Sequence, residues 1–189
     1  MKVLVTGCTG FIGSHLCEQL SKENDVSVVG MTRNKSRSPQ FKDFFEIRYG
    51  DLLNQDTLKN VTKDIDVVIH LAALMRFHEP YENLYRHNVD GTRFIALDAM
   101  KNNVKHFIYV SSTEAIGPVD IIPADESAPC HPTYGYGKTK QISEEWLNQQ
   151  YNETGFPLTI VRPTGVYGPG DSYVGLSTIR AVANKKIKA

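Results

Sequence analysis

The feature that most constrains this chain is a run of three spaced glycines between a short apolar segment and an amphipathic one. Residues 6–13 read Thr-Gly-Cys-Thr-Gly-Phe-Ile-Gly and follow directly on the β-branched segment Lys2–Thr6. Gly7 permits a tight turn, Gly10 lets a phosphate group approach the backbone, and Gly13 allows a helix to lie close to the strand. The helix N-terminus adds unpaired N–H groups and a partial positive charge. The pattern predicts a phosphate-binding loop, with a ligand-free glycine turn as the alternative.

Short apolar segments alternate with segments of helical period along the chain. Such alternation predicts one α/β domain over residues 1–189, a Rossmann-type doubly wound parallel sheet with helices on both faces. The expected strands are Lys2–Thr6, Val26–Met31, a short strand before Gly50, Asp66–His70, His106–Val110 and Leu158–Val161. The expected helices carry the apolar repeat Ile12, Leu16 and Leu20 or span Asn83 to Met100 and Tyr134 to Tyr151.

The composition argues against several classes of partner. Basic and acidic residues number 21 each and apolar residues make up 41%, so neither disorder nor binding to nucleic acid is indicated. No segment has the length of a signal-peptide core or a membrane span, so we expect no membrane association. Cys8, Cys17 and Cys130 are an odd number without the close spacing of a metal or disulfide framework, which favours a reducing, cytoplasmic setting.

The residues after the second expected strand bear on the kind of nucleotide. An NAD site usually has an acidic residue there for the ribose 2′-hydroxyl, and positions 26–41 contain no Asp or Glu. Arg33, Lys35 and Arg37 would instead attract a 2′-phosphate. NADP is therefore preferred over NAD, although a solvated basic loop would have the same composition. Asp51 is placed to accept a hydrogen bond from an adenine amino group or to cap the next helix.

Groups suited to proton transfer follow the expected strand His106–Val110. Ser112 lies just after this strand, and Tyr134 and Lys138 are one helical turn apart near the start of the next helix. A nearby ammonium group lowers the pKa of a phenol, which allows tyrosine to act as a general acid or base. The sequence therefore predicts a catalytic set of Ser112, Tyr134 and Lys138.

A second pair, Tyr136 and Lys140, has the same spacing, so the residues alone leave the register open. Segment 132–138 reads Pro-Thr-Tyr-Gly-Tyr-Gly-Lys and resembles the Pro-x-Tyr-Gly-x-Ser-Lys signature of extended short-chain dehydrogenases, the NAD(P)-dependent epimerase/dehydratase family. This resemblance places Tyr134 in the catalytic position. Further matches are His-Leu-Ala-Ala at 70–73, Asn-Val-Asp-Gly-Thr at 88–92, Val-Ser-Ser at 110–112 and Arg-Pro-Thr-Gly-Val-Tyr-Gly-Pro at 162–169.

The resemblance implies cofactor-binding residues along nearly the whole chain and no metal. Ala72 and Ala73 would line the cofactor, Asn88 would support the active-site network, and segment 163–166 would touch the nicotinamide amide. Read without the family, Asn88 is a buried helical amide and His70 a strand-end histidine with satisfied nitrogens. The expected cofactor-binding residues are Gly7, Thr9, Gly10, Phe11, Ile12, Gly13, Arg33, Asp51, Leu52, Leu71, Ala72, Ala73, Asn88, Ser111, Tyr134, Lys138, Pro163, Thr164 and Val166.

The implied function is an NAD(P)-dependent oxidoreductase or epimerase that acts by hydride transfer on a secondary alcohol or ketone, first of all a nucleotide sugar. The alternatives are a dihydroflavonol- or hydroxysteroid-type reductase or dehydrogenase, a non-catalytic NADPH-sensing regulator, and an interaction module without a nucleotide. Retention of all three catalytic residues argues against the regulator. Segment 112–114 reads Ser-Thr-Glu and lacks the Asp of the Thr-Asp-Glu motif in family dehydratases, which argues against dehydration.

The chain is also shorter than members of this family. We therefore expect a fragment that contains the cofactor domain and largely lacks the C-terminal substrate lobe, a natural minimal protein being the alternative. By the same resemblance, the helices from Asn83 and from Tyr134 would pair across a two-fold axis in a homodimer.

Overall fold

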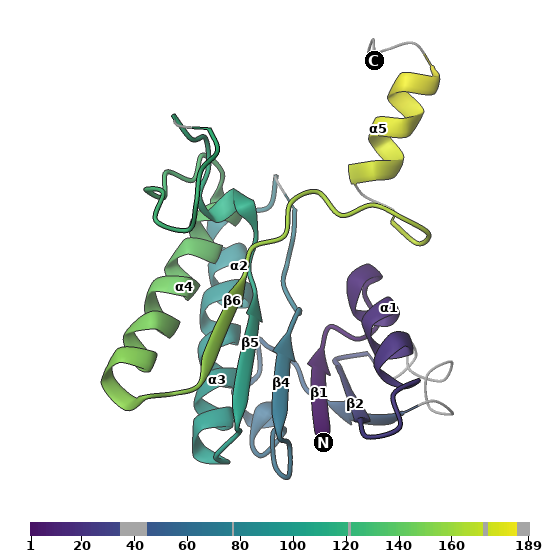
Figure 1. Ribbon diagram of the computed structural model, residues 1–189, viewed down its shortest axis with the longest axis vertical. Helices are drawn as coiled ribbons and strands as arrows, with labels where there is room; N and C mark the ends of the chain where they lie inside the picture. Colours follow the sequence, from purple (N-terminus) through teal and green to yellow (C-terminus); the bar gives the residue numbers. More distant parts are fainter. Residues whose placement is uncertain (35–44, 77, 121, 172–173, 185–189) are drawn as a thin grey trace.

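The centre of the molecule is a sheet of six parallel strands, seen in a computed structural model that describes residues 1–34, 45–76, 78–120, 122–171 and 174–184 (Figure 1). The strand order is β3-β2-β1-β4-β5-β6. Strands are thus added toward one edge of the sheet from β1 to β3 and toward the other edge from β4 to β6, so the order reverses between β1 and β4. In open parallel sheets, ligands bind at the carboxyl ends of the strands beside such a switch point. The strands are β1 (Lys2–Thr6), β2 (Ser27–Thr32), β3 (Glu46–Tyr49), β4 (Val67–His70), β5 (His106–Val110) and β6 (Leu158–Val161).

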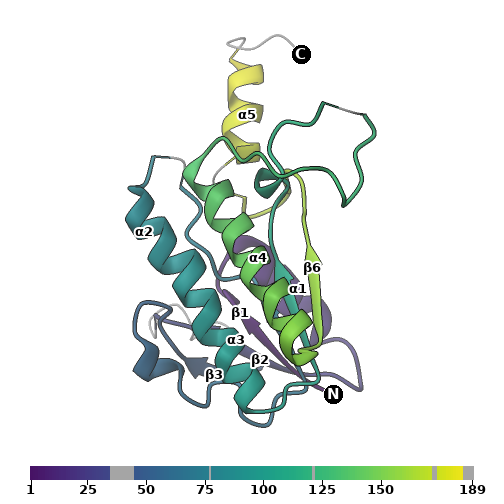
Figure 2. The same cartoon turned by 90° about the vertical axis from the view of Figure 1, so that its left-hand side faces the viewer.

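Helices lie on both faces of this sheet, as predicted. The views in Figures 1 and 2 place α2, α3 and α4 on one face and α1 on the other. The helices are α1 (Phe11–Leu20), α2 (Tyr81–Tyr85), α3 (Gly91–Lys101), α4 (Gly135–Thr154) and α5 (Val174–Ala183). Three short elements are the 3-10 turns η3 (Gln55–Leu58) and η5 (Thr113–Ala115) and the π-helical turn η4 (Arg86–Asp90).

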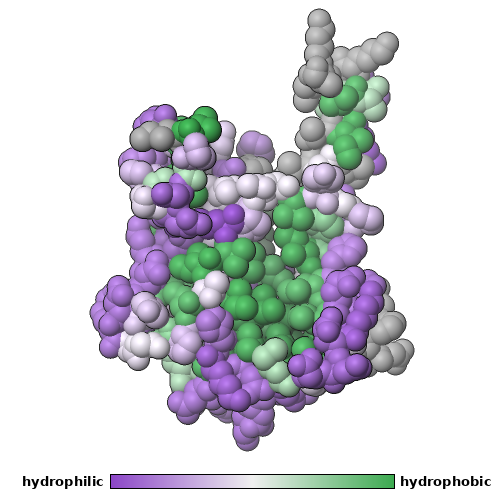
Figure 3. Space-filling view, viewed as in Figure 1, coloured by the Kyte–Doolittle hydropathy of each residue, from purple (hydrophilic) through white to green (hydrophobic). Residues whose placement is uncertain are grey.

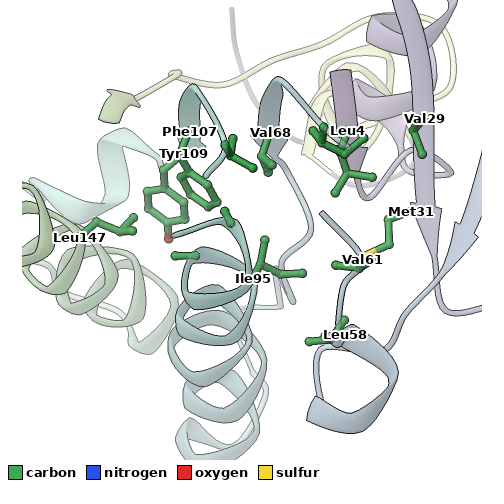
Figure 4. Close-up of a cluster of buried hydrophobic side chains, with 14 of the residues drawn as sticks. Leu4, Val29, Met31, Leu58, Val61, Val68, Ile95, Phe107, Tyr109 and Leu147 are labelled. Carbon is green, nitrogen blue, oxygen red and sulfur yellow. The ribbon is translucent and has the colours of Figure 1, made fainter. Parts of the chain in front are cut away.

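Alternating side chains of the strands supply two apolar clusters, one on each face. Leu4 of β1 joins Phe107 and Tyr109 of β5 in the larger cluster, which packs against α3 and α4 (Figure 4). Val3 and Val5 point the other way, toward α1. Figure 3 shows apolar surface over β4, β5 and β6 on the α1 side, so the sheet is covered more fully on one face than on the other.

The region expected as one helix, Asn83 to Met100, is interrupted. The helix continues from α2 to α3 through η4, whose wider turn contains the buried Asn88. Such π-turns insert a residue into a helix and re-aim its side chains. In the described ranges, no helix combines the length and the apolar character needed to cross a membrane.

Candidate active site

The glycine loop packs as its spacing predicts. Gly7 has φ of 72°, in the left-handed region, and a Cβ there would lie 3.0 Å from the backbone nitrogen of Ala72. A Cβ on Gly13 would lie 2.2 Å from the carbonyl oxygen of Gly7, so α1 approaches β1 as closely as the backbone allows. Gly10 precedes α1 without a side-chain cap, which leaves first-turn N–H groups available to an anion.

A cavity of about 260 Å³ opens beside this loop. It is bounded by the carboxyl ends of β2, β3 and β4 and by η4. The expected residues that line it are Gly7, Thr9, Gly10, Arg33, Asp51, Leu52, Leu71, Ala72 and Ala73. The lining residues that sequence reasoning missed are Met31, Thr32, Gly50, Leu74 and His87. Thr32, Gly50 and Leu74 adjoin expected positions and Met31 ends the expected second strand, so strand ends could have indicated these four. His87 reaches the cavity through the π-turn η4, which the sequence does not indicate.

Other expected residues lie around this cavity without lining it. Phe11 and Ile12 begin α1, and Gly13 is buried beneath it. Ser111 is buried at the end of β5, where its Oγ has no hydrogen-bond partner within the described ranges. An orphaned hydroxyl and an uncapped helix N-terminus fit a ligand that brings phosphates and polar sugar groups. Lys35 and Arg37 lie outside the described residues.

A directional chain of hydrogen bonds through His70 connects the loop to η4. The Thr92 hydroxyl donates to the carbonyl oxygen of Asn88, so it must accept from Nε2–H of His70 at 3.0 Å. His70 Nδ1 is then the acceptor for the Thr6 hydroxyl at 2.8 Å, and that oxygen in turn accepts from the Ala72 N–H at 3.1 Å. Burial lowers the pKa of His70 to about 3, which keeps the ring neutral. The interpretation of His70 as a satisfied strand-end histidine is confirmed.

Asn88 connects the cavity wall to α4. Its side chain accepts from the Leu74 N–H at 2.7 Å and donates to the Leu74 carbonyl oxygen at 3.1 Å. It also donates to the hydroxyl of Thr139 on α4 at 3.0 Å. The amide thus holds residues 72–74 against the helix that contains both tyrosine–lysine pairs, although it does not line the cavity itself.

The structure separates the two tyrosine–lysine pairs of α4. Tyr134, which precedes the helix, is 54% exposed, and Lys138 is exposed. Tyr136 and Lys140 are 7% and 2% exposed. Two residues correspond to about 200° of rotation around a helix, so the two pairs occupy opposite faces. The pair expected from the sequence faces outward, and its alternative faces the sheet.

The buried pair lies against the segment that contains Ser112. Lys140 Nζ donates to the carbonyl oxygen of Val110 at 2.8 Å, at the end of β5. The Oγ of Ser112 accepts from the Glu114 N–H at 3.2 Å. A Cβ on Gly137 would lie 2.2 Å from the Glu114 carbonyl oxygen, so α4 packs directly on η5. The structure therefore packs the segment 110–114, which contains Ser112, against the face of α4 that carries Tyr136 and Lys140.

Burial dominates the titration of this pair. It raises the pKa of Tyr136 to about 12, with a further contribution from the negative charge of Glu114. It lowers the pKa of Lys140 to about 7, and the charge of Glu144 opposes that change. Lys140 Nζ lies 4.5 Å from the ring centroid of Tyr109 and 5.9 Å from that of Tyr136. The chain thus holds a neutral phenol beside an amine that changes charge near neutral pH.

The segment after β6 is held at its start by an ion pair. Arg162 donates two hydrogen bonds to Glu144 of α4, and the shorter measures 2.6 Å. The Thr113 N–H donates to the Pro163 carbonyl oxygen at 3.1 Å. The segment that follows β6 then crosses above the strand ends (Figure 1), and it contains the expected residues Pro163, Thr164 and Val166. They lie outside the lining of the 260 Å³ cavity.

A second cavity of about 680 Å³ lies between α4, β6 and the loop after η5. Its lining includes Asp125, Tyr151 and Arg162 and none of the expected cofactor-binding residues. It is therefore separate from the glycine loop despite its larger volume. Over the described part of the chain, no cluster of His, Cys, Asp and Glu is arranged to hold a metal ion.

Comparisons with known proteins agree with this geometry. The model of the NAD dependent epimerase/dehydratase family matches residues 3–188. An Escherichia coli O157:H7 protein, N-acetyl-alpha-D-glucosaminyl-diphospho-ditrans,octacis-undecaprenol 4-epimerase, is 34% identical over 169 residues, which cover 88% of this chain and 49% of that protein. Curated relatives of this kind are matched over 49% to 58% of their length.

Solved structures show the same arrangement of elements. UDP-glucuronic acid 4-epimerase from Bacillus cereus in complex with NAD superposes with a TM-score of 0.79 at 29% identity, over 90% of this chain and 59% of that one. UDP-glucose 4-epimerase from Thermotoga maritima with UDP-glucose gives 0.84 at 28% identity, over 95% and 61%. Because the family model matches nearly the whole sequence, this chain belongs to the NAD dependent epimerase/dehydratase family.

Proposed function

We propose that this chain is the cofactor-binding part of an NAD(P)-dependent enzyme that interconverts a secondary alcohol and a ketone on a nucleotide sugar, with epimerisation as the net reaction. The observation that carries this proposal is that the glycine-loop cavity and Ser112 both lie at the carboxyl ends of strands of one sheet. Asn88 also joins Leu74 of the cavity wall to Thr139 of α4. The similar 4-epimerases support the substrate class. The lack of the dehydratase Asp at Thr113 favours epimerisation or simple reduction over dehydration.

A nicotinamide dinucleotide, when bound, would supply the hydride acceptor or donor. The backbone N–H groups around Gly10 would hold its pyrophosphate, and Ala72 and Ala73 would line its path. Arg33 at the end of β2 would pair with a 2′-phosphate, and the absence of an acid between positions 26 and 34 favours NADP over NAD. Asp51 would accept a hydrogen bond from the adenine amino group.

For proton transfer we propose Tyr136 and Lys140 in place of Tyr134 and Lys138, because the buried pair lies on the face of α4 that packs against the Ser112 segment. The Ser112 hydroxyl would bond the substrate oxygen that gains or loses the proton. Tyr136 Oη would donate that proton in the reducing direction, since burial raises its pKa and keeps the phenol protonated at neutral pH. In the oxidising direction, a protonated Lys140 would stabilise the phenolate.

We also propose that the protein forms a homodimer and lies in the cytoplasm. Tyr81, Leu97 and Tyr151 expose 44%, 46% and 53% of their surface on α2, α3 and α4, which supports a homodimer through these helices. Burial raises the pKa of Cys8 and Cys17 to about 11 and about 12, so both remain protonated thiols inside the fold. Unpaired thiols fit the reducing cytoplasm that we propose.

Cofactor binding is the first test. We expect NADP⁺ and NAD⁺ to raise the melting temperature of the chain, since a ligand at about 100 times its Kd stabilises a fold by about 2.7 kcal/mol. The polypeptide extended to its complete reading frame should then interconvert UDP-sugar epimers, measured by chromatography of the sugar nucleotides. Absence of a thermal shift with either dinucleotide would refute the proposal. A shift without turnover on any UDP- or dTDP-sugar, hydroxysteroid or dihydroflavonol would favour the regulator.

A further inference from the structure

The segment from Pro163 to Gly170, here called the strap, runs from the end of β6 across the top of the sheet to α1. Figure 1 shows it above the carboxyl ends of β5, β4 and β1, and Figure 2 shows it on the same side of the sheet as α1. At its far end, the Asp171 N–H donates to the Gly168 carbonyl oxygen at 3.1 Å, and Asp171 Oδ2 accepts from the Gly175 N–H at 2.7 Å. These two bonds close a turn at the far end of the strap and join that turn to the start of α5.

Phe11 and His15, in the first turns of α1, form the surface that the strap contacts. Phe11 and His15 are four residues apart, and their rings meet edge to face with centroids separated by 5.6 Å. A Cβ on either Gly168 or Gly170 would lie 3.7 Å from the Phe11 ring, so the strap backbone rests against this ring. His15 Nε2 lies 2.8 Å from the carbonyl oxygen of Pro169.

The direction of this hydrogen bond follows from its partners. A carbonyl oxygen can only accept, so Nε2 of His15 must carry the hydrogen. The bond joins residues 154 positions apart in sequence, and it connects the helix behind the glycine loop to the strap. His15 does not line the glycine-loop cavity. It can therefore influence a bound dinucleotide only through the strap or the helix.

We propose that His15 is a positioning residue, which holds the strap over the nicotinamide half of the cofactor site by its hydrogen bond to Pro169. This inference rests on the proposed function and on the family resemblance, which implies that segment 163–166 touches the nicotinamide amide of a bound cofactor. The phosphate half of the site belongs to the glycine loop and needs no strap. Loss of the His15 hydrogen bond should accordingly weaken ligands that contain nicotinamide and spare those that do not.

Calorimetric titration with two probes, NAD⁺ and ADP-ribose, separates these halves. His15→Leu should weaken NAD⁺ about fivefold, the effect of one hydrogen bond of about 1 kcal/mol, and change ADP-ribose less than about twofold. His15→Gln keeps an N–H donor at a similar reach and should bind both probes as the parent chain does. Gln19→Leu, an exposed position one turn further along α1, is the matched control and should change neither affinity.

Hydrogen exchange of the ligand-free chain gives a readout that does not depend on the cofactor. His15→Leu should speed exchange of the Asp171 amide and leave the Gly10 amide, which bonds to Gly7, unchanged. Equal losses for NAD⁺ and ADP-ribose, or no loss for either together with unchanged exchange, would overturn the inference. A parent chain that binds neither probe would instead refute the proposed function, and the inference with it.

Discussion

The glycine loop follows β1, and the start of α4 packs on η5, which follows β5, yet the sequence specifies these two regions in different ways. The loop is eight consecutive residues whose spacing fixes backbone positions, because Gly7 and Gly13 are required by contacts within the loop and its neighbouring strand. The tyrosine–lysine spacing on α4 occurs twice, and only the rotation of the helix decides which copy faces the sheet. A backbone motif is therefore read from spacing alone, whereas a side-chain motif on a helix requires knowledge of packing.

The largest effect should come from the hydroxyl that transfers the proton. In the complete enzyme, Tyr136→Phe should lower kcat by about 10²- to 10⁴-fold, the usual contribution of a general acid or base. Tyr134→Phe, on the outward face, is the matched control and should retain most of the activity. Steady-state assays with a UDP-sugar that the parent enzyme turns over provide the measurement. The reverse ranking would restore the register expected from the sequence and break the comparison.

The second largest effect should distinguish Lys140 from Lys138, by the way in which the free energy of unfolding depends on pH. The pKa of Lys140 falls from 10.5 to about 7 on folding, so the unfolded chain binds more protons between these values and stability rises with pH in that window. Lys140→Met removes this penalty and should stabilise the fold by several kcal/mol below about pH 7, since one pKa unit equals about 1.4 kcal/mol. The gain should shrink toward pH 10.

Urea unfolding at several pH values measures this difference. Lys138→Met is the control, because it makes the same substitution at the exposed lysine of the other pair. A Lys140→Met variant whose stability followed the parent curve at every pH would show that the buried amine carries no cost. Burial of Lys140 would then not distinguish the two faces of α4 by their effect on stability.

The same difference between local and long-range contacts explains how much of the fold and of the site could be predicted from the sequence. Strand positions were predicted within one residue, because short β-branched runs bounded by turn residues define them locally. Nine residues of the cavity lining were also expected, all at the glycine loop or at strand ends. The register on α4 was left open by the residues alone and assigned to Tyr134 by resemblance, whereas Tyr136 is the tyrosine that faces the sheet. The residues could not decide it, since it depends on contact of Gly137 with Glu114. His87 was missed because it reaches the cavity through the π-turn η4, which interrupts a segment with ordinary helical periodicity.

Alanine at the two close-packed glycines should separate binding from catalysis. Gly13→Ala and Gly137→Ala each place a Cβ 2.2 Å from a backbone oxygen, and overpacking of this kind costs about 1–3 kcal/mol. We expect Gly13→Ala to weaken the dinucleotide, and Gly137→Ala to lower kcat with nearly unchanged cofactor affinity. Gly165→Ala, where an added Cβ meets nothing within 4 Å, controls for the substitution in urea unfolding. Equal effects of the first two variants on affinity would contradict the division of roles.

The smallest effect concerns the charge of Arg33 at the end of β2. It tests whether a side chain, in addition to the backbone of the glycine loop, contributes to the choice between NADP⁺ and NAD⁺. Arg33 lines the cavity but is exposed, so solvent screens its interaction with a 2′-phosphate. Arg33→Glu should therefore shift the NADP⁺ to NAD⁺ affinity ratio by about tenfold toward NAD⁺, with most of the loss on NADP⁺. Lys101→Glu, a charge reversal at the exposed end of α3, should leave the ratio unchanged in the same titrations. Equal losses of affinity for both dinucleotides would mean that Arg33 does not contact the 2′-phosphate. Ligand selection at the glycine loop would then be assigned to its backbone and not to Arg33.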